Sequence, residues 1–121
     1  MSEQQRKKLE SETMALQKLQ KEYATLVTSR QKLDSQLQEN TLVSKEFKLL
    51  SDEARVYKLI GPVLVPQEKA EAATNVEKRL EYITAELSRL EKRIEDQAKE
   101  QEKTSVEIFK LQMDIQGVSK A

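Results

Sequence analysis

Apolar residues in this chain recur at the spacing of a coiled coil on both sides of one short interruption. In the first half, twelve positions from Leu9 to Phe47 follow alternating three- and four-residue steps, and eight of them are apolar. In the second half, thirteen positions from Val76 to Val118 follow the same steps without a phase slip, and ten are apolar. This repeat predicts two long helices, each with one narrow apolar seam.

Proline and glycine mark the interruption. Both prolines and one of the two glycines lie in "VYKLIGPVLVP", Val56 to Pro66. The pattern predicts a helix over 4–50 with a frayed beginning, a β-hairpin over 54–66 and a second helix over 67–118. We expect Pro66 to lie where the second helix begins and Gly117 where it ends. The halves are nearly symmetric about Gly61, so the helices should pack antiparallel within a single domain, residues 1–121.

The composition suits such a fold better than a globule. Hydrophobic residues make up 37% of the 121 residues, charged residues 35% and aromatic residues 4%. Globular domains are richer in apolar residues, whereas a coiled coil needs only a seam. Disorder is the rival interpretation, but it does not require regular apolar spacing. The predicted fold class is mainly α: a long antiparallel two-helix coiled coil with a central β-hairpin.

Charge and residue types exclude several functions. The 21 basic and 21 acidic residues cancel, which argues against nucleic acid or an anionic membrane as partner. The chain has no cysteine and no histidine, which excludes disulfides, thiolate catalysis and zinc sites of the Cys/His kind. It also lacks a phosphate-binding glycine loop and a nucleophile–base set. We therefore expect no enzyme activity, no catalytic residues, no metal and no cofactor. The N-terminus lacks the apolar run of a signal peptide, which favours a soluble intracellular protein.

Polar residues interrupt both seams, five of them of particular interest. Arg30 and Asn40 lie in the first seam, and Gln97, Gln101 and Thr104 lie in the second. Single polar residues in a coiled-coil core fix its register at some cost in stability. We interpret these five positions as register control.

The predicted hairpin is apolar on both faces in any register. An isolated two-stranded hairpin is marginally stable in water, and one coiled coil is too thin to cover its faces and edges. It either folds over the end of the coil as a local cap or joins strands from other chains in a shared sheet or barrel. We favour assembly, for which the candidate residues are Val56, Tyr57, Leu59, Gly61, Pro62, Val63, Leu64 and Val65.

Three segments resemble the prefoldin family. "YKLIGPVLVPQE" (Tyr57 to Glu68), between two coiled-coil helices, looks like the prefoldin hairpin. "RQKLDSQLQEN" (Arg30 to Asn40) and "EAATNVEKRLEYITAEL" (Glu71 to Leu87) are similar to helices of the subunit-six family within it. These segments cover about the central 60 residues, and the flanking arms match in pattern and length. One hairpin rather than two indicates the β class of subunits.

The resemblance implies a function and partners. Prefoldin is a hexamer of two α-class and four β-class subunits, whose strands form a double β-barrel with projecting coiled coils. It is an ATP-independent holdase in the cytoplasm that captures unfolded clients, notably actin and tubulin, and delivers them to the cytosolic group II chaperonin. The expected partners are thus two α-class subunits, three further β-class subunits, these clients and the chaperonin, with no nucleic acid and no membrane.

Client contact is expected at the open end, where helix ends fray and seam residues become accessible. The candidates are Leu9, Met14, Leu16, Ile108, Phe109, Leu111, Met113, Ile115 and Val118. Phe109 and Met113 lie off the strict seam, and methionine suits adaptable surfaces. The alternative interpretation is that these terminal seam residues only pack against each other and close the coiled coil. The two interpretations are compatible if the tip opens transiently.

Two other functions compete. A structural coiled-coil tether would show the same seams, but it would not need a two-faced apolar hairpin. A prefoldin-like subunit of a different assembly would use the same hairpin.

Overall fold

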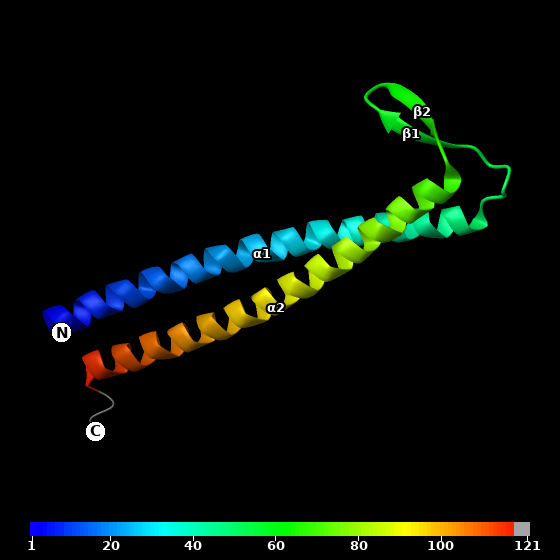
Figure 1. Cartoon of the computed structure of the whole chain (residues 1–121). Helices are drawn as coiled ribbons and strands as arrows, with labels where there is room; N and C mark the ends of the chain where they lie inside the picture. Colours follow the sequence, from blue (N-terminus) through cyan, green and yellow to red (C-terminus); the bar gives the residue numbers. More distant parts are fainter. Residues whose placement is uncertain (118–121) are drawn as a thin grey trace. The chain divides into compact units, whose positions relative to one another are not determined.

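The computed structural model describes residues 1–117 and consists of two long helices joined through a β-hairpin (Figure 1). In chain order, the elements are α1 (Glu3–Leu49), β1 (Val56–Ile60), β2 (Val63–Gln67) and α2 (Lys69–Gln116). The predicted fold class is confirmed, and the predicted helix bounds differ from the observed ones by one or two residues. Gly117 follows α2 with a φ of 74°, so it ends the helix as expected.

The chain divides into two compact units, each of which combines part of α1 with part of α2. The terminal unit contains residues 1–29 and, of its second segment, the described residues 90–117. The hairpin unit contains residues 30–89, and therefore the end of α1, both strands and the start of α2. Within each unit, the α1 segment and the α2 segment run antiparallel (Figure 1).

Burial follows the predicted seams in both helices. Every predicted seam position from Leu9 to Phe47 and from Val76 to Ile115 is buried or half-buried. Ile83 is the most enclosed of them, with 2% of its surface exposed, and Leu26 and Leu87 are each 7% exposed. Val118, the last predicted seam position, lies outside the described residues. The heptad pattern thus predicts which side of each helix is covered.

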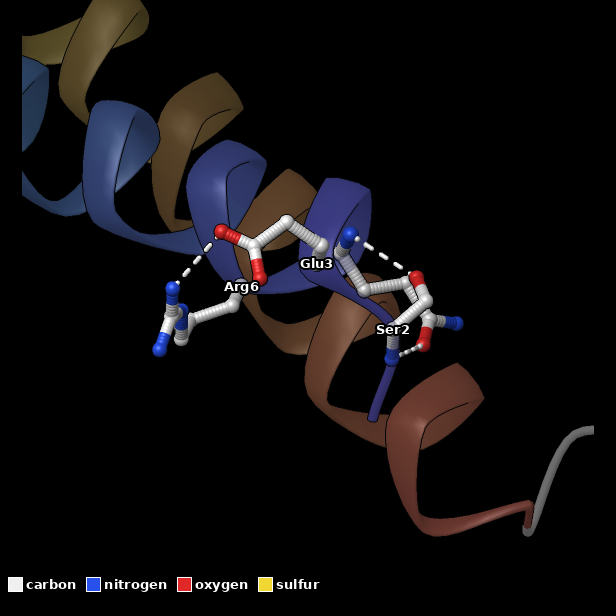
Figure 2. Close-up of polar contacts among 4 residues, drawn as sticks. Ser2, Glu3 and Arg6 are labelled. Atoms are coloured by element: carbon white, nitrogen blue, oxygen red, sulfur yellow. Dashed lines mark hydrogen bonds and ion pairs between the residues drawn. The ribbon is translucent and has the colours of Figure 1, made fainter.

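A capping box starts α1 in place of the frayed beginning that we expected (Figure 2). The Ser2 backbone N–H donates to Gln5 Oε1 at 2.9 Å, and the Gln5 backbone N–H donates to Ser2 Oγ at 3.1 Å. Arg6 pairs with Glu3 at 2.8 Å in the same turn. Two N–H groups that lack partners within the helix are satisfied reciprocally. The signal for this start was Ser2 followed three residues later by Gln5.

Pro66 belongs to β2, so its predicted place at a helix start is wrong. Pro66 pairs with Tyr57, and β2 continues to Gln67. The Ala72 N–H donates to the Glu68 carbonyl at 2.9 Å, which makes Glu68 the cap of α2. A proline fits an outer strand position because its missing N–H would point away from the neighbouring strand.

Lys69 ties the start of α2 to the end of α1 within the hairpin unit. Its Nζ donates to the carbonyls of Leu50 and Ser51 at 3.0 and 3.2 Å. It also lies 3.8 Å from the fully exposed Asp52 carboxylate. The Leu50 carbonyl directly follows α1, where carbonyls lack partners within the helix and carry partial negative charge, so a lysine there is stabilising. The Ser51 carbonyl also accepts the Ala54 N–H at 3.1 Å. Ser44 adds a second link between the helices by donating to Glu77 Oε1 at 2.5 Å.

We expect Lys69→Met to lower the free energy of unfolding by about 1 kcal/mol, because two carbonyls lose a charged donor. The control is Asp52→Asn, which removes only the long exposed ion pair and should change stability by less than about 0.5 kcal/mol. Urea unfolding followed by circular dichroism measures both. Equal effects of the two substitutions would assign the stabilisation to the ion pair and contradict the carbonyl-capping role.

Candidate functional site

The hairpin turns through two residues, Gly61 and Pro62. Ile60 pairs with Val63 on either side of the turn. Gly61 has a φ of 57°, which matches the first central position of a type II′ turn, the geometry that suits the twist of paired strands. A Cβ at Gly61 would meet no atom within 4 Å, so its backbone conformation, and not crowding, favours glycine. The predicted turn at Gly61 and Pro62 is confirmed.

The strand register divides the hairpin into two faces. Directly paired residues share a face, and successive residues alternate between faces. One face consists of Tyr57, Leu59, Leu64 and Pro66, all without charge. The opposite face consists of Val56, Lys58, Ile60, Val63, Val65 and Gln67. We call them the uncharged face and the lysine face.

Both faces leave large apolar side chains exposed. On the uncharged face, Leu59 is 67% and Leu64 is 63% exposed, and these two residues are direct partners across the strands. On the lysine face, Ile60 and Val63 are exposed to a similar extent. Contiguous apolar surface of this kind marks an interaction site in a soluble protein. Of the eight predicted assembly residues, all lie in this hairpin, and only Val56 is half-buried.

The apolar surface extends from the hairpin onto the end of α1. A groove of about 370 Å³ in the hairpin unit is lined by Leu42, Val43, Glu46, Phe47, Leu50, Arg55, Val56 and Tyr57. Leu42 is 62% exposed and Val43 is 42% exposed. The sequence interpretation missed this extension. Its signal was the apolar pair Leu42-Val43, which lies outside the seam between Asn40 and Ser44.

The seam of the terminal unit contains a run of three polar positions on α2, Gln97, Gln101 and Thr104, whereas the polar seam positions of the hairpin unit, Arg30, Asn40 and Ser44, all lie on α1. Gln97 Nε2 donates to Glu22 Oε2 at 3.0 Å, in a partly buried position. Gln97 Oε1 and Gln101 Nε2 are buried and have no hydrogen-bond partner. Thr104 is 8% exposed. Unsatisfied buried polar groups cost free energy, so these helix segments hold together less firmly than an aliphatic seam would.

The predicted tip residues fall into two groups. Met14 and Phe109 are 69% and 60% exposed. The half-buried group comprises Leu9, Leu16, Ile108, Leu111, Met113 and Ile115. Met113 is thus partly covered although it lies off the heptad positions. Val118 falls outside the described residues, and Val106, which is 45% exposed, was not predicted.

The part of the chain that the structure describes was compared with the requirements of a metal cluster and of a membrane-spanning helix. Within residues 1–117, no group of three or more histidine, cysteine or acidic side chains is arranged to hold a metal ion. No helix in the same range combines the length and apolar character that crossing a membrane requires.

Comparisons with known proteins give one family. A family model described as "Prefoldin subunit" matches residues 10–115. Prefoldin subunit 6 of Saccharomyces cerevisiae is 50% identical over 95 residues, covering 78% of this chain and 83% of the relative. Prefoldin subunit 6 of Homo sapiens is 42% identical over 121 residues, covering 100% of this chain and 94% of the relative.

Solved structures agree with the fold. The prefoldin beta subunit from Thermococcus strain KS-1 matches with a TM-score of 0.76 and 23% identity, covering 84% of this chain and 89% of that one. The beta2 subunit from the same strain matches with a TM-score of 0.65 and 27% identity, covering 76% and 98%. Sequence and fold lead to the same conclusion: this chain belongs to the prefoldin subunit family.

Proposed function

We propose that this chain is a β-class subunit of a hetero-oligomeric prefoldin co-chaperone that acts in the cytoplasm. In this proposal the hairpin joins it to two α-class and three further β-class subunits. The assembled complex is an ATP-independent holdase that captures unfolded actin and tubulin and delivers them to the cytosolic group II chaperonin. The family match over residues 10–115 includes both compact units, which supports a single prefoldin-like domain.

The observation that carries the proposal is the exposure of the hairpin on both faces. A local cap would cover one face against its own helices, yet Leu59, Leu64 and Ile60 are each more than half exposed. A structural tether has no use for such a surface and would pay for it in aggregation. Strands of other subunits are the natural cover, because they can bury the side chains and satisfy the strand edges together.

The terminal unit supports client capture. Unfolded chains expose apolar side chains, and Met14 and Phe109 offer accessible, adaptable apolar contacts. The polar seam with its unpaired Gln97 Oε1 and Gln101 Nε2 lowers the cost of separating the helices, so half-buried residues such as Ile108 can join the binding surface. With local opening, the same tip residues can close the coiled coil in one state and contact an unfolded client in the other.

The first prediction concerns assembly. Leu59→Asp combined with Leu64→Asp places two charges on the uncharged face, and burial of unpaired carboxylates is strongly unfavourable. We expect helicity to be kept while co-purification of the co-expressed α- and β-class subunits is lost. The matched control, Gln17→Asp with Gln31→Asp, adds the same charges at exposed helix positions and should assemble normally. Normal assembly of the hairpin variant would refute the hairpin as the joining element.

The second prediction concerns clients. Met14→Ser with Phe109→Ser should weaken suppression of actin aggregation by the assembled complex and leave its subunit composition unchanged, since only exposed apolar contacts are lost. Tyr82→Ser is the control, because Tyr82 is a similarly exposed aromatic residue, at 63%, on α2 in the hairpin unit. Equal aggregation curves for the tip variant and the parent complex would contradict client contact at these residues.

The third prediction tests opening of the polar seam. Gln101→Leu removes a buried donor without a partner and adds apolar contact, so the free energy of unfolding should rise by about 1–2 kcal/mol. Capture of denatured actin should weaken if opening exposes the binding surface. Gln17→Leu makes the same change at an exposed position and should leave stability within about 0.5 kcal/mol of the parent. If the variant is more stable but captures denatured actin as well as the parent does, client binding does not depend on opening of the seam.

A further inference from the structure

The terminal unit contains a groove whose charged side chains are mostly basic. It has a volume of about 430 Å³ and is formed by residues of α1 and α2 that all belong to this unit. Three positive charges and one negative charge give its lining a net charge of +2, although the whole chain is neutral. A concave surface with charges mainly of one sign concentrates their field and attracts ligands of the opposite sign. The lining residues are Lys18, Lys21, Glu22, Thr25, Leu26, Arg93 and Gln97.

Helix spacing explains why these residues meet. Lys18, Lys21 and Thr25 are three and four residues apart, so they follow one side of α1. Arg93 and Gln97 are four residues apart and share a side of α2 in the same way. From Lys18 to Thr25, α1 rises by about 10 Å, at about 1.5 Å per residue. An extended peptide advances about 3.3 Å per residue, so the groove matches the length of a segment of about three residues.

The three cations of the groove have no carboxylate partner in the part of the chain that the structure describes. Elsewhere on the helices, Arg6 and Arg89 each pair with a nearby glutamate at 2.8 Å. Within residues 1–117, Lys18, Lys21 and Arg93 form no such pair. All three side chains belong to exposed residues. They are therefore available to carboxylates of another molecule.

The acidic residues near the groove do not occupy these cations. Glu22 is the one acidic residue among those that line the groove, and its Oε2 accepts a hydrogen bond from Gln97 Nε2 at 3.0 Å. Asp96 and Glu100 line a neighbouring groove together with Arg93. Neither of them forms an ion pair with Arg93 in the described residues. The positive character of the groove is thus not cancelled by internal pairing.

The uncharged parts of the lining favour a peptide over a simple anion. Leu26, which is 7% exposed, supplies an apolar contact, and lysine and arginine carry apolar stems below their charged ends. A segment with an apolar side chain between carboxylates can use both parts, whereas inorganic phosphate uses only the charges. Gln97 Oε1 is buried without a donor. Opening of the seam, as proposed above, brings this atom within reach of a main-chain N–H, which a peptide has and phosphate lacks.

We propose that this groove binds acidic segments of unfolded clients, with their carboxylates at Lys18, Lys21 and Arg93 and an apolar side chain beside Leu26. The inference rests on the proposed client capture and adds a substrate class, the acidic peptide, to the apolar contacts of the tip residues. Ion pairs at exposed positions are individually weak, so several act together and tolerate clients of different sequence. Attraction between opposite charges also speeds the encounter with the client.

Binding of a labelled peptide tests the groove directly. The probe is a fluorescein-labelled, unstructured peptide of glutamate, leucine, glycine and serine, and its binding to the full chain is followed by fluorescence anisotropy. A control peptide has glutamine in place of each glutamate. We expect the acidic peptide to bind about tenfold more tightly than the control peptide, because three exposed ion pairs contribute about two- to threefold each. Equal affinity for the two peptides would overturn the proposal.

A variant without the three cations tests whether this groove is the site. Lys18→Gln combined with Lys21→Gln and Arg93→Gln should weaken binding of the acidic peptide about tenfold, for the same reason. The matched control is Lys32→Gln with Lys45→Gln and Lys78→Gln, which removes the same charge at exposed positions of the hairpin unit. It should bind within about twofold of the parent, since distant exposed charges are screened by salt. Unchanged binding by the groove variant, or an equal loss in the control, contradicts the assignment.

Glu22→Gln gives a prediction of opposite sign. The glutamine oxygen can still accept from Gln97 Nε2, so the link between the helices is kept while the negative charge is lost. Binding of the acidic peptide should therefore become about twofold tighter. Weaker or unchanged binding by a variant with normal helicity would contradict an electrostatic role of the groove.

A labelled single-stranded oligonucleotide of the same charge as the peptide distinguishes the acidic peptide from other polyanions. We expect it to bind more weakly, because it lacks an apolar side chain to place beside Leu26. If it binds as tightly as the peptide and loses affinity in the Lys18/Lys21/Arg93 variant, the groove recognises negative charge of any kind, and the peptide assignment is wrong.

The two proposals fail in different ways. If the assembled complex does not suppress aggregation of actin, the proposed function fails, whatever the groove binds. If the complex suppresses aggregation but the acidic peptide binds equally to the parent chain and to the Lys18/Lys21/Arg93 variant, client capture stands and only the groove assignment is lost.

Discussion

Burial of a narrow apolar seam is the constraint on which the rest of this structure depends. The chain is too poor in apolar residues to fill a globular core, so each helix covers one stripe and leaves its other sides to solvent. Inside the seam, Leu26, Ile83 and Leu87 are almost fully enclosed. A fold with so little interior cannot also cover a hairpin, and the strands therefore remain exposed. The low apolar content of the chain thus accounts both for the narrow helix seams and for the exposed hairpin.

The packing of the seam differs between the two units. In the hairpin unit, two links join the helices, Lys69 to the end of α1 and the seam residue Ser44 to Glu77. The terminal unit has a seam broken by Gln97 and Gln101, with unpaired polar atoms in both. The buried polar atoms without a hydrogen-bond partner therefore lie in the terminal unit, for which we propose client binding, and the linked helix segments lie in the hairpin unit, for which we propose assembly. The interpretation as register control and the proposal of local opening both rest on Gln97 and Gln101.

The two helices and their buried sides could be predicted from the sequence, because the heptad spacing of apolar residues places them on one side of a helix. Every described seam position is buried or half-buried. The turn at Gly61-Pro62 could also be predicted from the sequence. Pro66 was misplaced because proline suits both a helix start and an outer strand position, and only the strand register distinguishes them. Leu42 and Val43 were missed because heptad analysis assigns off-seam residues to solvent. Exposed fractions and unpaired glutamine atoms depend on side-chain packing, which spacing alone does not specify.

The Lys69 contacts have a consequence for the affinity of the proposed joining of subunits. Because Lys69 bonds the carbonyls of Leu50 and Ser51, the segment between them is a closed loop whose ends are held together before any partner arrives. Loop closure has an entropic cost, and here it is met during folding of the single chain. Less conformational freedom then remains to be lost on association, so we expect Lys69 to tighten the proposed joining of subunits through preorganisation of the hairpin.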